Sequence, residues 1–194
     1  LQALNEKKVV GGTAWLWAHN DARETLDYLL VDEAGQMSLA HVLAASRAAK
    51  NVILLGDPQQ LEQPQKASHP EGADVAALTH LLDNRITMPE NKGIFLGITR
   101  RLHPNIKHFT SEVFYENRLD SLSGLDNQAL HGNTQFRGAG LFYVPVNHKG
   151  KQNKSIEEVV VVEKIVSSLT ANGEWTSAAG QRKRITLENI LIVA

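Results

Sequence analysis

The sequence has no cysteine among its 194 residues. This excludes disulfide bonds and thiolate metal sites, and it fits an intracellular protein of the cytoplasm or, in a eukaryote, the nucleus. Apolar stretches of membrane-spanning length and a signal-peptide pattern are also missing, so we expect no membrane partner. Neither sign of charge dominates. The formal net charge is −1, so any contact with a polyanion must come from a local groove.

Clustered metal ligands are a further absence. The eight histidines are scattered without the spacing of zinc ligands, so we expect no zinc site. Repeats and low-complexity tracts are missing as well. The fractions of apolar and charged residues, 42% and 21%, are ordinary. This composition is typical of a globular protein with a hydrophobic core.

Two apolar runs, residues 28–31 and 52–55, are each followed by polar side chains. Consecutive aliphatic residues without polar alternation are typical of strands buried on both faces of a parallel sheet. In open α/β sheets, ligands bind beyond the carboxyl ends of such strands. The polar residues in these positions are Asp32, Glu33, Asp57 and Gln60. The pattern predicts a nucleotide site at one edge of a parallel sheet.

The adjacent carboxylates Asp32 and Glu33 suit two steps of phosphoryl transfer. The first can hold the hydration shell of Mg²⁺, which prefers one or two carboxylates together with phosphate oxygens. The second can orient and deprotonate an attacking water. The alternative is an acidic pair that simply begins a helix, because Asp and Glu are favourable near helix N-termini.

Three motifs in order resemble those of superfamily 1 helicases. Leu-Leu-Val-Asp-Glu-Ala-Gly-Gln at residues 29–36 resembles motif II, the Walker B element, and Gly-Asp-Pro-Gln-Gln-Leu at residues 56–61 resembles motif III. Thr-Arg-Arg-Leu-His-Pro at residues 99–104 is similar to the Q-Y-R-M-H-P signature of their second RecA-like domain. The most similar subgroup is the 5′-to-3′ translocating branch.

The resemblance implies an α/β fold with parallel RecA-like (P-loop NTPase) sheets. Residues 1–97 would be the C-terminal part of the first RecA-like domain, with motifs II and III. Residues 98–194 would be the N-terminal part of the second. The expected activity is ATP hydrolysis coupled to translocation along single-stranded DNA or RNA and to duplex unwinding.

The resemblance also implies a role for each site residue. Asp32 would bind Mg²⁺ through water, and Glu33 would activate the hydrolytic water. Asp57 would belong to the ATP site, where Gln60 would bond the γ-phosphate or that water. Arg101 would complete the site from the second domain by stabilising charge in the transition state. Arg100 stands at the aromatic position of the signature, so a stacking role there is in doubt.

No Gly-x-x-x-x-Gly-Lys-[Ser/Thr] loop occurs in the sequence. In the family this phosphate-binding loop would lie upstream of Leu1, and a last arginine motif would lie downstream of Ala194. We therefore expect a fragment that does not hydrolyse ATP by itself. The resemblance is also compatible with a nuclease domain linked to the helicase in the parent protein.

Local patterns predict further elements. Helices are expected at residues 37–50, at 73–82, after His103-Pro104 and after the capping box Ser155-x-x-Glu158. Pro104 suits the first helical position, and His103 is expected to be a capping or packing residue. Strands are expected at residues 9–10, 93–98, 141–144 and 189–194, and loops at 62–72, 83–92 and 119–140. The predicted core-facing residues are Leu39, Val42 and Leu43 in the first helix and Ile106, Phe109 and Val113 in the third.

Two other functions remain open. One is a helicase-derived nucleic-acid-binding or interaction module without ATPase activity. The other is a different P-loop enzyme such as a small-molecule kinase, which would not need the motifs at residues 56–61 and 99–104. Two basic runs, residues 149–154 and 182–184, could contact nucleic acid, but solvated loops or turns are the favoured interpretation.

Overall fold

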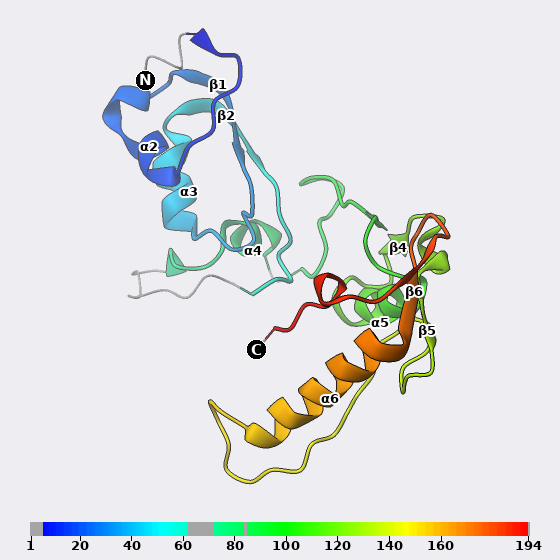
Figure 1. The fold of residues 1–194 in the computed structure, drawn as a ribbon. Coiled ribbons are helices and arrows are strands. Elements are labelled where there is room, and N and C mark those ends of the chain that lie inside the picture. Colours follow the sequence, from blue (N-terminus) through cyan, green and yellow to red (C-terminus); the bar gives the residue numbers. More distant parts are fainter. Residues whose placement is uncertain (1–5, 62–71, 84, 194) are drawn as a thin grey trace. The chain divides into compact units, whose positions relative to one another are not determined.

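The computed structural model describes residues 6–61, 72–83 and 85–193 (Figure 1). It contains helices and strands in a mixed α/β arrangement with small sheets. The chain divides into two compact units, Leu1–Phe95 and Leu96–Ala194. None of the helices in the described residues combines the length and apolar character that crossing a membrane requires.

The first unit is built on a parallel pair of strands. Strand β1 (Leu26–Val31) pairs with β2 (Ala49–Leu54), with Leu29 opposite Val52. Helix α3 (Leu39–Ser46) connects them, and the strands lie side by side in Figure 1. The strand–helix–strand prediction is therefore confirmed. The helix is shorter than the predicted 37–50, because Ser38 caps it and residues 49–50 already belong to β2.

The prediction that both faces of these strands are buried is wrong. Leu29 and Val31 are 5% and 6% exposed, whereas Tyr28 and Leu30 on the other face are each 60% exposed. The described sheet has only two strands, and the buried core lies against one face of it. Leu43, a predicted core residue of α3, is 57% exposed. The core consists mainly of Trp17, Ala22, Leu29, Val31, Val42, Ala45, Ala48 and Leu78.

Short helices complete the first unit. Helix α2 (Ala14–Ala18) packs against α3, and the 3-10 helix η1 (Asn20–Ala22) leads to β1. Helix α4 (Ala77–Leu82) begins later than the predicted residue 73, but Leu78 and Leu82 are buried. The predicted strand at residues 9–10 does not form. Most of the predicted loop at 62–72 lies outside the described residues.

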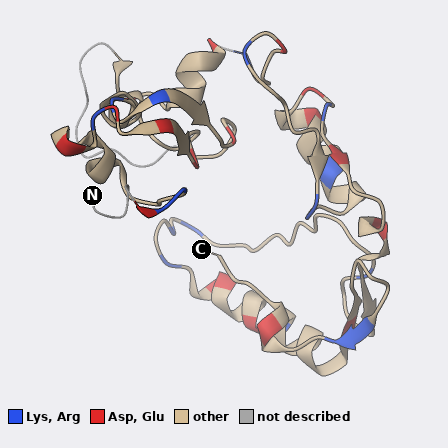
Figure 2. Ribbon diagram, turned by 90° about the horizontal axis from the view of Figure 1, so that it is seen from above, with Lys and Arg blue, Asp and Glu red and all other residues tan. Residues whose placement is uncertain are grey.

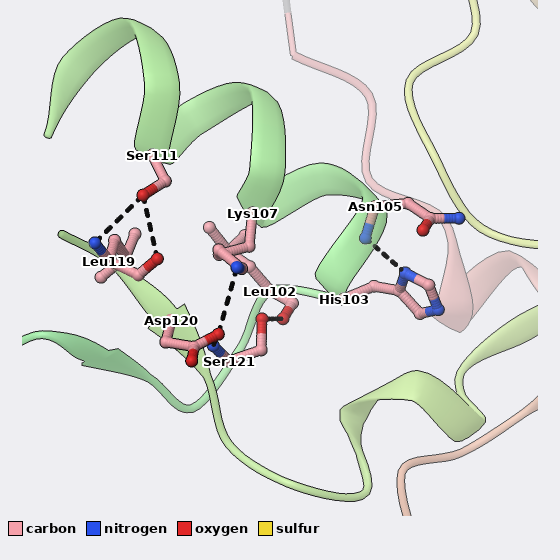
Figure 3. A network of polar contacts seen from close by, with 8 residues as sticks. All are labelled: Leu102, His103, Asn105, Lys107, Ser111, Leu119, Asp120 and Ser121. Carbon is pink, nitrogen blue, oxygen red and sulfur yellow. Dashed lines mark hydrogen bonds and ion pairs between the residues drawn. The ribbon is translucent and has the colours of Figure 1, made fainter. Parts of the chain in front are cut away.

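The second unit begins with strand β3 (Ile98–Thr99), helix α5 (Pro104–Phe114) and strand β4 (Asp120–Ser121), which pairs parallel to β3. As predicted, His103 caps α5: its Nδ1 accepts a hydrogen bond from the Asn105 N–H at 3.0 Å (Figure 3). The predicted strand at 93–98 is wrong except at its last residue.

Polar side chains join α5 to β4 (Figure 3). The buried Ser111 hydroxyl donates to the Leu119 carbonyl at 2.9 Å and accepts from the Leu119 N–H at 3.0 Å. Lys107 Nζ lies 3.1 Å from Asp120 Oδ1 and lowers the pKa of that carboxyl. The predicted core residues Phe109 and Val113 are 49% and 50% exposed, so the apolar spacing identified the helix but not its buried face.

A three-stranded antiparallel sheet forms the rest of the second unit. Its strands, in spatial order, are β5 (Ala129–Gly132), β6 (Gly173–Thr176) and β7 (Arg182–Arg184). Helix α6 (Ile156–Asn172) begins after Ser155, whose hydroxyl accepts from the Glu158 N–H as predicted. The 3-10 helices η3 and η4 span Leu125–Asn127 and Leu187–Asn189.

Four predictions in this region are wrong. The expected loop at 119–140 contains β4 and β5, the expected turn at 182–184 is β7, and no strand forms at 141–144 or 189–193. In the last two segments, Tyr143 is 91% exposed and Leu191 87% exposed. Apolar runs predict burial, and these runs have no described neighbour that buries them.

Candidate nucleotide site

The ends of β1 and β2 are joined by backbone hydrogen bonds. The Leu55 N–H donates to the Val31 carbonyl, and the Ala34 N–H donates to the Leu55 carbonyl, each at 2.8 Å. The turn that follows β1 therefore lies directly beside the turn that follows β2. This places the four predicted site residues of the first unit at the same edge of the parallel pair: Asp32, Glu33, Asp57 and Gln60.

Two glycines allow this close approach. A Cβ atom on Gly35 would collide with the backbone carbonyl of Asp57. A Cβ atom on Gly56 would lie 2.8 Å from the Ala34 nitrogen, and Gly56 has a φ of +154°. Both positions therefore need a residue without a side chain. The two turns pack backbone against backbone, which fixes how far apart their polar side chains can be.

Asp32 and Glu33 are both exposed. The Glu33 N–H donates to Asp32 Oδ1 at 3.0 Å. Glu33 has a left-handed backbone with a φ of +54°, and its carbonyl accepts from the N–H groups of Gln36 and Met37. A non-glycine residue in this conformation costs of order 1–3 kcal/mol, and such strain clusters at functional sites. The turn thus orients Glu33 at an energetic cost.

Side chains of both turns hold Gln60. Its Nε2 lies 3.5 Å from Asp57 Oδ2, and its Oε1 accepts from Gln36 Nε2 at 3.0 Å. The other Asp57 oxygen accepts from the Gln59 N–H at 3.0 Å. Sequence reasoning assigned no role to Gln36, although it ends the motif at residues 29–36. Its position four residues after Asp32 was the available signal.

Arg101 belongs to the second unit, immediately after β3. Its N–H donates to Thr99 Oγ1 at 3.3 Å, and the same oxygen accepts from the Leu102 N–H. Arg101 and Arg100 are both exposed. The structure thus brings four of the five predicted site residues together within the first unit and leaves Arg101 in the other.

The carboxylates at this edge fit Mg²⁺ held through water. In the described residues, no three or more His, Cys, Asp or Glu side chains form a cluster that could hold a metal by themselves. Mg²⁺ does not need such a cage, because it keeps several waters and uses one or two carboxylates with substrate phosphates. Asp32 provides an exposed carboxylate of this kind.

Comparison with known proteins finds one matching family model and several similar helicases. Residues 1–64 match the family model described as an AAA domain, which has a P-loop fold. Helicase sen1 of Schizosaccharomyces pombe is 30% identical over 143 residues, covering 72% of this chain and 8% of the relative. The DNA replication ATP-dependent helicase/nuclease DNA2 of Gallus gallus is 26% identical over 122 residues, covering 62% and 12%.

The 5′-3′ DNA helicase ZGRF1 of Mus musculus is 26% identical over 182 residues, covering 88% of this chain and 9% of the relative. The chain therefore has distant similarity to superfamily 1 helicases. It spans only 8% to 12% of the length of these three curated relatives. No solved structure matches it significantly.

Proposed function

We propose that this chain forms part of the ATPase core of a superfamily 1 helicase of the 5′-to-3′ branch. In this proposal ATP hydrolysis drives movement along single-stranded DNA or RNA and unwinding of duplexes. The two units are parts of two RecA-like domains, with the boundary near residue 97. The observation that supports the proposal is the joined pair of turns after β1 and β2. Asp32 and Glu33 belong to the first turn, and Gln60 in the second is bonded to Gln36 and Asp57, one residue from each turn.

Asp32 and Glu33 divide the work at the end of β1. Asp32 holds the hydration shell of Mg²⁺, and when bound this ion neutralises charge on the phosphate oxygens. Glu33 accepts the proton of the attacking water, which makes the water a better nucleophile. Glu33 has a left-handed backbone, and its carbonyl accepts from the N–H groups of Gln36 and Met37. The chain therefore turns at Glu33 and does not continue in the direction of β1.

Gln60 links the site to the state of the nucleotide. Its amide can donate to a γ-phosphate oxygen or orient the attacking water. Hydrogen bonds to Gln36 and Asp57 hold Gln60 in place until that partner arrives. Loss of the γ-phosphate would remove this interaction of Gln60. Because Gln60 contacts residues of both turns, the turns after β1 and β2 would change together.

Arg101 is proposed to act from the second domain. A guanidinium brings a permanent charge and paired donors to a phosphoryl group, which stabilises charge as the terminal phosphate leaves. Its place directly after β3 resembles the arginine of the Q-Y-R-M-H-P signature. Domain closure would bring it to the nucleotide, so hydrolysis and closure would be coupled.

Hydrolysis of ATP by the full-length protein, with and without single-stranded DNA or RNA, tests this function. Turnover stimulated by one of the polymers is expected, and the stronger activator identifies the substrate. A folded protein that binds strands but never hydrolyses ATP would overturn the proposal in favour of a helicase-derived binding module. The lack of a Gly-x-x-x-x-Gly-Lys-[Ser/Thr] loop in the 194 residues keeps that module as the second candidate.

A further inference from the structure

The two units differ in charge. Residues Leu1–Phe95 contain twelve Asp and Glu against eight Lys and Arg, a net charge of −4. Residues Leu96–Ala194 contain nine and twelve, a net charge of +3. Figure 2 shows Asp and Glu along α6 and a continuous basic strand at β7. The near-neutral net charge of the whole chain thus conceals a basic region in the second unit.

The antiparallel sheet β5–β6–β7 brings distant residues onto one polar face. His131 pairs with Glu174, which pairs with Arg184, while Thr176 pairs with Arg182. Paired residues in antiparallel strands point to the same side, as do residues two apart on one strand. These five side chains therefore share one face.

The opposite face of this sheet is mainly apolar, with Lys183 opposite Trp175 at its β7 edge. Leu130 pairs with Trp175, and both line a cavity of about 440 Å³ together with Leu169, Ile185, Ile190 and neighbouring residues. Ile185 is 5% exposed. Because this side packs against the unit's own apolar residues, the polar side is the one available to a partner.

A second cavity, of about 430 Å³, opens beside the polar face. Its lining includes His131, Arg137 and Arg182. Two backbone hydrogen bonds between Leu130 and Gly138, at 2.7 and 2.9 Å, fix the segment that carries Arg137 against β5. Arginines from β7 and from this segment therefore approach one hollow from separate parts of the chain.

Most of the positive charge on this face is not neutralised within the protein. Arg182 Nε lies 2.6 Å from Glu174 Oε2, which orients the guanidinium but leaves its two terminal nitrogens for other acceptors. Among the described residues, no ion pair involves Arg137 or Arg184, and both side chains are exposed. Among the five side chains of the sheet face, Glu174 is thus the one carboxylate beside the two guanidinium groups of Arg182 and Arg184.

Aromatic rings lie next to these charges in the sequence. Phe136, which precedes Arg137, has its ring centroid 4.9 Å from that of Phe142. Phe142 is 47% exposed and Tyr143 is 91% exposed. Proteins that bind single strands combine exposed aromatic rings, on which bases stack, with cations that contact phosphates, and residues 136–143 carry both.

We propose that His131, Arg137, Arg182 and Arg184, called here the basic face, bind the phosphodiester backbone of single-stranded nucleic acid. The site adds a strand contact outside the three helicase-like motifs. It rests on the proposed function in that a single strand is the substrate. Guanidinium groups suit phosphates because their paired donors match two oxygens at once.

Fluorescence anisotropy of the purified chain with fluorescein-labelled dT20 or rU20 tests the basic face. The variant R137A/R182A/R184A should bind about tenfold or more weakly at low salt, and its slope of log affinity against log salt should fall by about 2. The matched control K149A/K151A/K154A removes the same charge from another basic run of this unit and should change binding by less than about twofold.

Several results would overturn the inference. These are equal losses in the two triple variants, no loss in the first, or no binding by the wild type. Competition by polyglutamate as strong as by unlabelled oligonucleotide would indicate an acidic protein partner instead. If circular dichroism shows that the triple variant is unfolded, R184E replaces it, since Arg184 makes no ion pair in the described chain.

The proposed function fails in a different measurement. If the triple variant still binds the strand, the proposal of a basic face is wrong. The proposal that the full-length protein hydrolyses ATP would still stand. If the full-length protein does not hydrolyse ATP, the helicase proposal is wrong. A loss of strand binding in R137A/R182A/R184A would still support the basic face.

Discussion

The parallel pair of the first unit and the antiparallel sheet of the second present their side chains in opposite ways. In the first, two parallel strands end together, and the turns after β1 and β2 present Asp32, Glu33 and Gln60 at the strand ends. In the second, antiparallel β5, β6 and β7 present Arg182, Arg184 and His131 on a sheet face. Parallel pairing gathers residues at an edge, whereas antiparallel register gathers them across a surface. The first arrangement suits a nucleotide and the second an extended chain.

The largest effect is expected from a substitution that breaks the joined turns of the first unit. Gly35→Ala places a Cβ atom against the Asp57 carbonyl and should destabilise this unit by about 1–3 kcal/mol, the range of an overpacked core. Urea unfolding followed by tryptophan fluorescence measures it. Gly11→Ala is the control, because nothing lies within 4 Å of a Cβ atom there. Equal stability of both variants would contradict the close approach.

The next largest effect concerns the stability of the second unit. Ser111→Ala removes both hydrogen bonds to Leu119 and should cost about 1–2 kcal/mol, because the backbone groups of Leu119, the residue before β4, lose their partner. Thermal unfolding measures the loss. Ser167→Ala, at an exposed position of α6, should leave the transition unchanged. A similar shift in the two variants would show that Ser111 does not join α5 to β4.

A smaller effect tests how Gln60 is positioned. Gln36→Ala removes the 3.0 Å bond to Gln60 and should lower ATP turnover of the full-length protein by about tenfold, the equivalent of one hydrogen bond. The chain's stability should stay the same because both side chains are partly or fully exposed. Gln59→Ala is the control, since Gln59 Nε2 bonds the Ile86 carbonyl instead. Unchanged turnover in Gln36→Ala would remove Gln36 from the site.

The smallest effect concerns pH. Lys107 holds the pKa of Asp120 below its usual value of 3.8. A carboxyl with a lowered folded-state pKa adds stability above its unfolded pKa, and this is lost as pH falls through the folded value. Unfolding between pH 6 and pH 2 should show a slight additional loss below about pH 4. Lys107→Met should remove that increment, and an identical profile in the variant would contradict the pairing.

Local signals made part of this fold predictable. The apolar runs located β1 and β2, and the residues His103 and Ser155 marked the starts of α5 and α6, because caps depend on neighbours in sequence. The strand–helix–strand order also predicted that Asp32 and Asp57 would share an edge. That inference needed only the parallel topology, since parallel strands end on the same side.

Nonlocal features were not predictable in the same way. Which face of β1 is buried depends on what packs against it, so Leu30 and Leu29 look alike in sequence but differ in exposure. The basic face depends on a register that pairs His131 with Glu174 and Glu174 with Arg184. His131 and Glu174 lie more than forty positions apart, so no short pattern joins them. The three consecutive basic residues at 182–184 favour a solvated turn by themselves, although they form the hairpin partner of β6.

We propose that the turn after β1 carries the base for ATP hydrolysis. The most direct test of this proposal is strand-stimulated turnover by the full-length protein beside Glu33→Gln and Glu24→Gln. Both glutamates are exposed and left-handed, with φ of +54° and +55°, but only Glu33 follows β1. Glu33→Gln should lose about 10²–10⁴-fold in turnover while Glu24→Gln keeps the wild-type rate. Wild-type turnover in Glu33→Gln would contradict the account.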